Sequence, residues 1–207
     1  MPTKEEILAG LAGIANEYSD IAIAWHVILI IVIAALFASW KPTNSSMILL
    51  VSSLLMSVSL FAGLQRNFFN AVVFSFLVLM SIYSAIKSKA GVIQGDRSWP
   101  DIAGLVLMVV GFIYPEFIVT GSTLEYAYLA PTGLIPCPTL SIVIGFALLY
   151  KGFMAPNWSV AIGITGIFYG LFGVFYLGMY IDWFLVAGSV LLMVNTFWLS
   201  KTSISAN

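Results

Sequence analysis

The sequence predicts an all-α fold, namely a polytopic membrane helix bundle with about seven transmembrane helices. Of its 207 residues, 61% are hydrophobic and 8% are charged, and the mean hydropathy is +1.04. A soluble domain carries roughly 25% charged residues. Apolar stretches of about 20 residues, the length that a helix needs to cross a bilayer, recur along the chain. We therefore predict one transmembrane domain over residues 1–207, with the lipid bilayer as its main partner.

The charged and metal-ligating residues exclude several classes of function. The chain has 8 Lys and Arg residues against 9 Asp and Glu residues, and the basic residues are spread singly, so we expect no nucleic-acid partner. It has one Cys and one His, which exclude an internal disulfide, a cysteine-rich cluster and a multi-histidine metal or haem site. We predict neither a metal site nor a cofactor.

The first 20 residues are predicted to contain a short amphipathic helix. Thr3 is followed three positions later by Glu6, which is the spacing of a capping box. Apolar residues then recur at helical spacing, namely Ile7, Leu8, Leu11 and Ile14. This helix should lie on the membrane surface and end near Asn16. A solvated lead-in to the first span is the alternative.

Seven apolar segments separated by turn-forming or polar residues follow. The predicted spans are residues 21–40, 45–64, 68–86, 101–119, 136–151, 158–176 and 182–199. Polar residues 87–100 and a loop rich in Gly, Tyr and Pro at 120–135 form the longest connections. The fifth segment is unusual, because the apolar run 139–150 is too short to cross a bilayer. It must either recruit the preceding Pro136-Cys137-Pro138 or be a broken helix.

The sixth predicted span is rich in glycine. Gly166 and Gly170 form a pair of small residues four positions apart, which lets two helix backbones approach closely. The pair predicts either a homo-oligomer or a partner membrane protein that packs against this span.

The basic residues predict the orientation of the bundle. With seven spans, one side holds six basic residues: Lys41, Lys87, Lys89, Arg97, Lys151 and Lys201. The other side holds only Lys4 and Arg66. The positive-inside rule places the first side in the cytoplasm. We therefore predict a multi-pass protein of the cell (plasma or inner) membrane, with its N-terminus outside and its C-terminus inside.

With this orientation, the polar residues in or near the spans gather toward the outer leaflet. Intramembrane ionisable residues are costly and usually face a bundle interior or a wet cavity. We therefore predict an outward-facing cavity lined by His26, Arg66, Asn70, Tyr114, Glu116, Cys137 and Asp182. The alternative is that the charged members are interfacial caps and ion pairs that reach water by snorkelling.

Cys137 and His26 each allow a functional and a structural interpretation. Two prolines flank Cys137 at the start of the fifth apolar segment, where the positive end of a helix dipole favours the reactive thiolate. The structural alternative is a small buried residue in a bent helix start. His26 could sense protons or bind a ligand, or it could be a hydrogen-bonded packing residue.

Several of these residues also form a recognisable pattern. They are Asn16, Tyr18 and Trp25, Tyr114-Pro115, the segment Gly133-Leu134-Ile135-Pro136-Cys137-Pro138-Thr139, and Asp182 with Gly188. In this pattern the chain resembles a family of uncharacterised bacterial membrane proteins, a domain of unknown function with a Pro-Cys-Pro-Thr signature. That family tends to have proline after the tryptophan of the first span, where this chain has His26. The resemblance implies a multi-pass membrane protein and no particular activity.

Three classes of function remain. The first is transport of a small solute or ion through the outward-facing cavity, gated near the proline-bent fifth span. The second is a membrane scaffold or an accessory subunit of a larger complex, which binds through the glycine-rich sixth span. The third and least favoured is a membrane-embedded thiol enzyme that pairs Cys137 with His26 or Glu116 as base.

Overall fold

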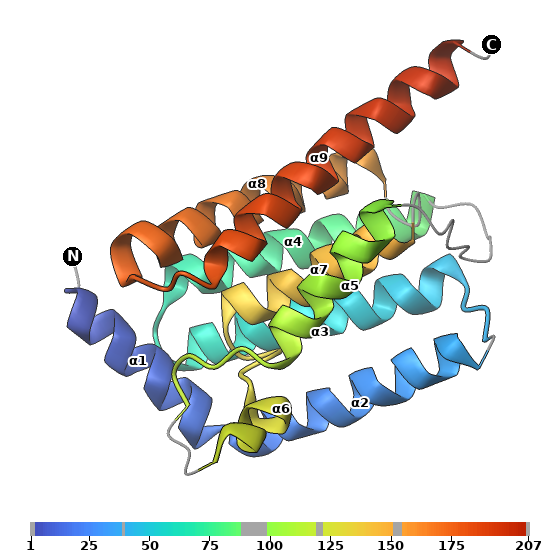
Figure 1. Ribbon diagram of the computed structural model, residues 1–207. Helices are drawn as coiled ribbons and strands as arrows, with labels where there is room; N and C mark the ends of the chain where they lie inside the picture. The colour runs from blue at the N-terminus through green and yellow to red at the C-terminus, as the bar shows by residue number, and fades with distance from the viewer. Residues whose placement is uncertain (1–2, 39, 88–98, 119–121, 151–154, 206–207) are drawn as a thin grey trace.

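The computed structural model describes residues 3–38, 40–87, 99–118, 122–150 and 155–205 (Figure 1). Within these ranges the secondary-structure elements are all helical. They are α1 Lys4–Glu17, α2 Ser19–Phe37, α3 Asn44–Leu64, α4 Phe68–Lys87, α5 Trp99–Phe112, η1 Thr123–Glu125, α6 Tyr126–Leu129, α7 Pro136–Leu149, α8 Pro156–Leu171, η2 Phe172–Leu177 and α9 Asp182–Ser205. η1 is a 3₁₀-helix, and η2 is a π-helix that continues α8.

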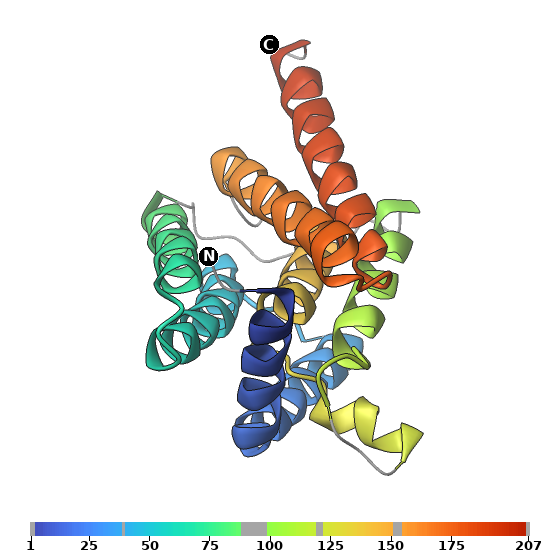
Figure 2. The same cartoon turned by 90° about the vertical axis from the view of Figure 1, so that its left-hand side faces the viewer.

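Helix α1 confirms the predicted N-terminal helix and its capping box. Thr3 accepts a hydrogen bond from the Glu6 backbone at 3.2 Å, and the Thr3 backbone donates to Glu6 Oε2 at 2.8 Å. The helix ends at Glu17, one residue beyond the expected end, and Tyr18 separates it from α2. In both ribbon views α1 lies across one end of the bundle (Figures 1 and 2). Its position on a membrane surface stays a prediction.

Each of the seven predicted spans contains an apolar helix, but the helices differ in length. Four are long and apolar enough to cross a membrane: Ser19–Phe37, Asn44–Leu64, Phe68–Ile86 and Pro156–Leu177. Three are shorter: Pro100–Phe112, Pro136–Leu149 and Asp182–Phe197. The chain is therefore a helical membrane protein with multiple candidate spans, and four of the seven predicted positions hold a helix that is long and apolar enough to cross a membrane.

The helix in the fourth predicted span, residues 101–119, is shorter than predicted. Helix α5 ends at Phe112, and the chain leaves the helical path before Pro115. A proline disfavours the helical conformation of the residue before it, which here is Tyr114. Phe117 then adopts a positive φ of 72°. The loop predicted at 120–135 contains two short helices, η1 and α6.

Parts of two other predictions lie outside the described residues. The predicted polar connection at 87–100 is described only at its two ends, in α4 and α5. Three of the basic residues that predict the orientation also lie outside the described residues, namely Lys89, Arg97 and Lys151.

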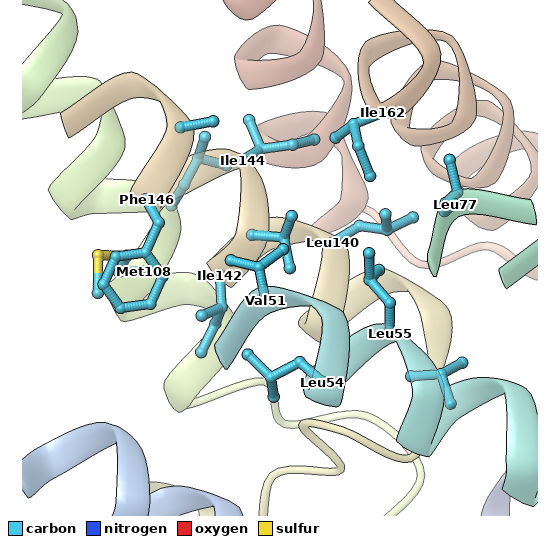
Figure 3. Packing of buried hydrophobic residues seen from close by; sticks show 14 of the residues in the cluster. Val51, Leu54, Leu55, Leu77, Met108, Leu140, Ile142, Ile144, Phe146 and Ile162 are labelled. Atoms are coloured by element: carbon cyan, nitrogen blue, oxygen red, sulfur yellow. The ribbon is translucent and has the colours of Figure 1, made fainter. Parts of the chain in front are cut away.

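The short helix α7 is the centre of the bundle. Every residue from Pro136 to Leu148 is buried, and the helix packs against α3, α5, α8 and α9. Figure 3 shows side chains of α7, such as Ile142 and Ile144, among apolar residues of its neighbours. α2, by contrast, exposes large apolar residues such as Ile31, as expected of a helix that faces lipid.

Glycines bring two helix pairs into close contact. A Cβ atom on Gly104 of α5 would lie 2.7 Å from the Gly145 carbonyl oxygen of α7, so the two backbones touch there. In the second pair, Gly166 and Gly170 of α8 pack against Ser189 and Val186 of α9. Both glycines of the predicted partner-binding pair therefore mediate packing within the chain. Association with a partner through α8 stays a prediction.

Three described connections between helices lie at one end of the bundle. The turn after α3, the segment after α5 and the turn after η2 lie at the same end as α1 (Figures 1 and 2). This is the grouping that underlies the predicted orientation. The side of the membrane that this end faces stays a prediction.

Candidate functional site

A cavity of about 570 Å³ opens at the end of the bundle that α1 crosses. Its lining comes from seven places: α1, the turn between α3 and α4, the start of α4, the segment after α5, the start of α7, the α8–η2 helix and the first residue of α9. Pockets of 300–1,000 Å³ are typical of sites for small molecules. Five of the seven candidate residues line it, namely Arg66, Asn70, Tyr114, Cys137 and Asp182.

The innermost polar pair is Tyr114 and Asp182. The Tyr114 hydroxyl donates to Asp182 Oδ1 at 2.9 Å, and each residue is only 1% exposed. A tyrosine hydroxyl ordinarily carries its proton at neutral pH, so Tyr114 is the donor of this bond. Asp182 is thus a buried carboxyl group held by a tyrosine, and it is not the solvated helix cap of the alternative interpretation.

The second oxygen of this carboxyl group, Oδ2, has no hydrogen-bond partner among the described residues. It lies directly against Gly173, where any side chain would collide with it. Buried polar atoms without a partner are uncommon, and an ionised carboxylate in this state is strongly destabilised. Among the described polar atoms of the site, Oδ2 is therefore one whose burial is not offset by a hydrogen bond.

The wide turns of η2 explain how Asp182 comes to face Gly173. The π-helix ends at Leu177, and the next residue, Gly178, adopts a left-handed conformation with φ 80° that glycine tolerates best. The Met179 backbone N–H then returns to the Gly173 carbonyl at 2.9 Å, and the Asp182 N–H binds the Met179 carbonyl at 3.1 Å. This tight reversal brings the first residue of α9 back onto η2. π-helical turns are frequent at functional sites.

Cys137 lies in the cavity wall beside this pair. Its side chain is 8% exposed, its thiol donates a weak hydrogen bond to the Tyr169 carbonyl at 3.9 Å, and it interacts with Asp182 and Tyr114. The Tyr169 hydroxyl in turn donates to Asn70 Oδ1 at 2.7 Å. Hydrogen bonds thus join α4, α7 and α8 around one wall of the cavity.

The start of α7 is fixed by a buried turn. Gly133 has a φ of 79° and lies under the indole ring of Trp25, which would collide with any side chain there. The Gly133 N–H donates to Thr139 Oγ1 at 2.8 Å, and that hydroxyl donates to the Ile135 carbonyl at 2.7 Å. Pro136 fits the first turn of the helix because it has no N–H to satisfy.

The mouth of the cavity is polar. Arg66 lies in the tight turn between α3 and α4 with a φ of 59°, and its side chain is exposed. Glu6 reaches the cavity from α1, while its carboxylate also caps that helix. The charged residues with access to water therefore surround the entrance, and Asp182 lies inside.

His26 and Glu116 do not line the cavity. The ring nitrogens of His26 lie 2.8 Å from the Ala22 carbonyl oxygen and 3.0 Å from that of Phe112, with the rings of His26 and Phe112 edge to face. His26 therefore joins α2 to the end of α5, as its structural interpretation expects. Glu116 is half-buried and acts on Asp182 only through its charge.

The sequence interpretation missed Tyr169, Gly173 and the inner face of α1. Tyr169 is a single polar aromatic residue within an apolar run, which is a weak signal in the sequence. Nothing local to Gly173 indicates that it faces Asp182, because the contact depends on the reversal after η2. In the part of the chain that the structure describes, no three His, Cys, Asp or Glu side chains are grouped to hold a metal ion.

No protein family model, curated protein or solved structure matches this chain. The family resemblance of the Pro-Cys-Pro-Thr segment stays a prediction, although the structure places several of its residues around the cavity. Trp25 covers Gly133, Tyr114 binds Asp182, and Cys137 lies beside them.

Proposed function

We propose that this protein transports a small solute across the membrane through the cavity beneath α1. The observation that carries the proposal is a largely aromatic and aliphatic cavity that encloses a buried carboxyl group with one unpartnered oxygen. In membrane proteins, buried ionisable residues typically mark substrate and ion pathways.

The helices around the cavity support the proposal because they are discontinuous. α5 stops at Phe112, α7 begins after a buried turn, and α8 changes to a π-helix at Phe172. Irregular backbone at membrane depth is tolerated where it is enclosed by protein or lines a cavity, and transporters often form binding sites from such interrupted helices.

α1 would form part of the entrance. Its inner face, including Ile7, Gly10 and Leu11, lines the cavity, and among the other helices it packs mainly against α2 and η2. The Asn16 side chain donates to the Phe117 carbonyl at 2.8 Å and attaches the end of α1 to the segment after α5. If the N-terminus is outside, as the basic residues predict, the cavity opens outward.

The two alternatives are supported less well. The scaffold hypothesis relied on Gly166 and Gly170, and both glycines pack against α9. The thiol-enzyme hypothesis named His26 or Glu116 as the base for Cys137, and neither residue lines the cavity where this thiol lies.

Two glycines of α1 offer a matched test. A Cβ atom on either Gly10 or Gly13 would meet nothing within 4 Å, but only Gly10 lines the cavity. Gly10→Trp should fill the cavity, and Gly13→Trp should leave it open. Purified protein in proteoliposomes would be tested for uptake of four membrane-impermeant solutes: a quaternary ammonium ion, an aryl sulfonate, a zwitterionic amino acid and a sugar.

We expect the wild-type protein to accelerate uptake of at least one solute over protein-free liposomes. Gly10→Trp should reduce this rate at least about tenfold relative to wild type, because the indole ring would fill the cavity that the solute must enter. Gly13→Trp should retain the wild-type rate. Transport through this cavity is disproved if none of the four solutes enters faster than in protein-free liposomes, or if Gly10→Trp transports as fast as Gly13→Trp.

A further inference from the structure

We infer that the solute is a small organic monocation with an apolar body, such as an ammonium ion that carries an aromatic ring. The inference rests on the proposed function, because it names the solute class for the same cavity.

The interior of the cavity holds an acid without a basic partner. Asp182 is 1% exposed, lines the cavity and keeps one oxygen unpartnered among the described residues. The other charged lining residues, Glu6 and Arg66, lie at the mouth. A cation inside the cavity would offset the unfavourable burial of the carboxylate. Because Oδ2 lies against Gly173, this attraction acts through the wall, and the ligand need not donate a hydrogen bond.

Aromatic side chains form part of the remaining lining. Five phenylalanines line the cavity: Phe68, Phe69, Phe117, Phe168 and Phe172. The face of an aromatic ring attracts a cation within about 6 Å, by about 0.5–2 kcal/mol according to how far the ion is desolvated. The same rings bury apolar surface of a ligand. A charged group attached to an apolar body can therefore use both kinds of contact.

The wall is poorly suited to an anion. The hydroxyl hydrogen of Tyr114 is given to Asp182, and that of Tyr169 is given to Asn70. Pro136 and Pro138 remove two of the N–H groups that the start of a helix normally offers to anions. Apart from the amide and guanidinium groups near the mouth, few donors in the described wall are free to bind a negative charge.

A bare metal ion also fits poorly. Calcium and magnesium take about six oxygen ligands. The described residues bring together no group of three His, Cys, Asp or Glu side chains, and Asp182 is the one acid in the interior of the described cavity. Aromatic and aliphatic side chains form most of the remaining wall.

Radiolabelled benzyltrimethylammonium is a suitable probe for the purified full-length protein in detergent, because its charge is permanent and its body is aromatic. Benzenesulfonate serves as the anionic competitor. We expect saturable binding of the labelled cation, with displacement by the unlabelled cation and little displacement by benzenesulfonate. Asp182→Asn, which keeps the size of the side chain, should weaken binding at least about tenfold. Asp101→Asn, which changes a buried aspartate at the opposite end of α5, should not weaken it.

A second pair of variants tests the rings and does not change any charge. Phe172 lines the cavity, whereas Phe175 lies on the same π-helix, is highly exposed and does not line it. Phe172→Leu should weaken binding of the cation by about two- to tenfold, the effect of losing one cation–π contact. Phe175→Leu should bind as wild type does. This pair decides the question if Asp182→Asn proves too unstable to purify.

The inference is overturned if the folded wild-type protein shows no saturable binding, if benzenesulfonate competes as well as the cation, or if both members of each variant pair bind equally. Failure of the proposed function is recognised separately. Binding that depends on Asp182 without uptake into proteoliposomes would support the ligand class and disprove transport. Uptake blocked by Gly10→Trp but restricted to the sulfonate, the amino acid or the sugar would support transport and disprove the ligand class.

Discussion

Tyr114 and Asp182 lie 68 positions apart in the sequence and share a buried hydrogen bond of 2.9 Å. The bond links the segment after α5 to the first residue of α9, and it fixes one of the two carboxylate oxygens in the cavity wall.

Tyr114→Phe should destabilise the protein by about 1–3 kcal/mol, because Asp182 Oδ1 would lose its donor while it remains buried. The measurement is the free energy of unfolding in detergent micelles. Tyr180→Phe is the control, since Tyr180 is 77% exposed and lies just before α9. In a double-mutant cycle with Asp182→Asn, the coupling energy should be about 0.5–3 kcal/mol. A coupling energy near zero would show that the two residues do not stabilise one another.

Gly173→Ala should destabilise the protein by about 1–3 kcal/mol, because the new methyl group would collide with Asp182 Oδ2. A loss of stability would identify the collision, since alanine in a helix is otherwise more favourable than glycine by about 0.5–1 kcal/mol. Gly13→Ala, where the methyl group meets open space, should be neutral or stabilising. In an Asp182→Ala background the loss at Gly173 should disappear. A loss that persists there would place the collision elsewhere.

Gly133→Ala should be more harmful than Gly178→Ala, as measured by the midpoint of thermal unfolding. Both glycines have a positive φ, of 79° and 80°, so each alanine carries a conformational penalty of about 1 kcal/mol. At Gly133 the methyl group would also strike the indole ring of Trp25, whereas at Gly178 the nearest atom is Lys4 Nζ at 3.5 Å. Equal losses at the two positions would contradict the close packing of Trp25 on the turn before α7.

His26→Phe should reduce the free energy of unfolding by about 1–3 kcal/mol, because the carbonyl at the end of α5 would lose a buried partner. Thr165→Val is a suitable comparison. The Thr165 hydroxyl donates to the Ala161 carbonyl within its own helix, so its removal should have a smaller effect. If both variants were equally stable, the contact between His26 and Phe112 would not contribute to stability.

Cys137 should react with a membrane-impermeant maleimide in intact cells, because its thiol lines a cavity that we predict to open outward. It is the single cysteine of the chain, so Cys137→Ser gives the background. The reaction should be slow, since the residue is buried, and Gly10→Trp should slow it further. Labelling by a permeant maleimide alone would reverse the predicted orientation. Absence of labelling by either reagent would exclude an open cavity.

The helices, their approximate positions and the first helix cap were predictable from the sequence because they depend on local chemistry. Apolar runs of about 20 residues define candidate spans whatever surrounds them. Thr3 and Glu6 form their capping box within one turn of helix. The gathering of polar residues toward one end also followed from the order of spans and loops. Five of these residues prove to line one cavity.

The tertiary structure alone decided which helices are central and which residues meet. α7 at the core and α2 at the exposed surface are both composed of apolar residues, because lipid tails are as apolar as a protein interior. Composition therefore could not distinguish them. The pairing of Tyr114 with Asp182 and the contact of Asp182 with Gly173 depend on where α5 stops and how the chain reverses after η2. Those contacts join residues that are distant in the sequence, so no local pattern in the sequence could specify them.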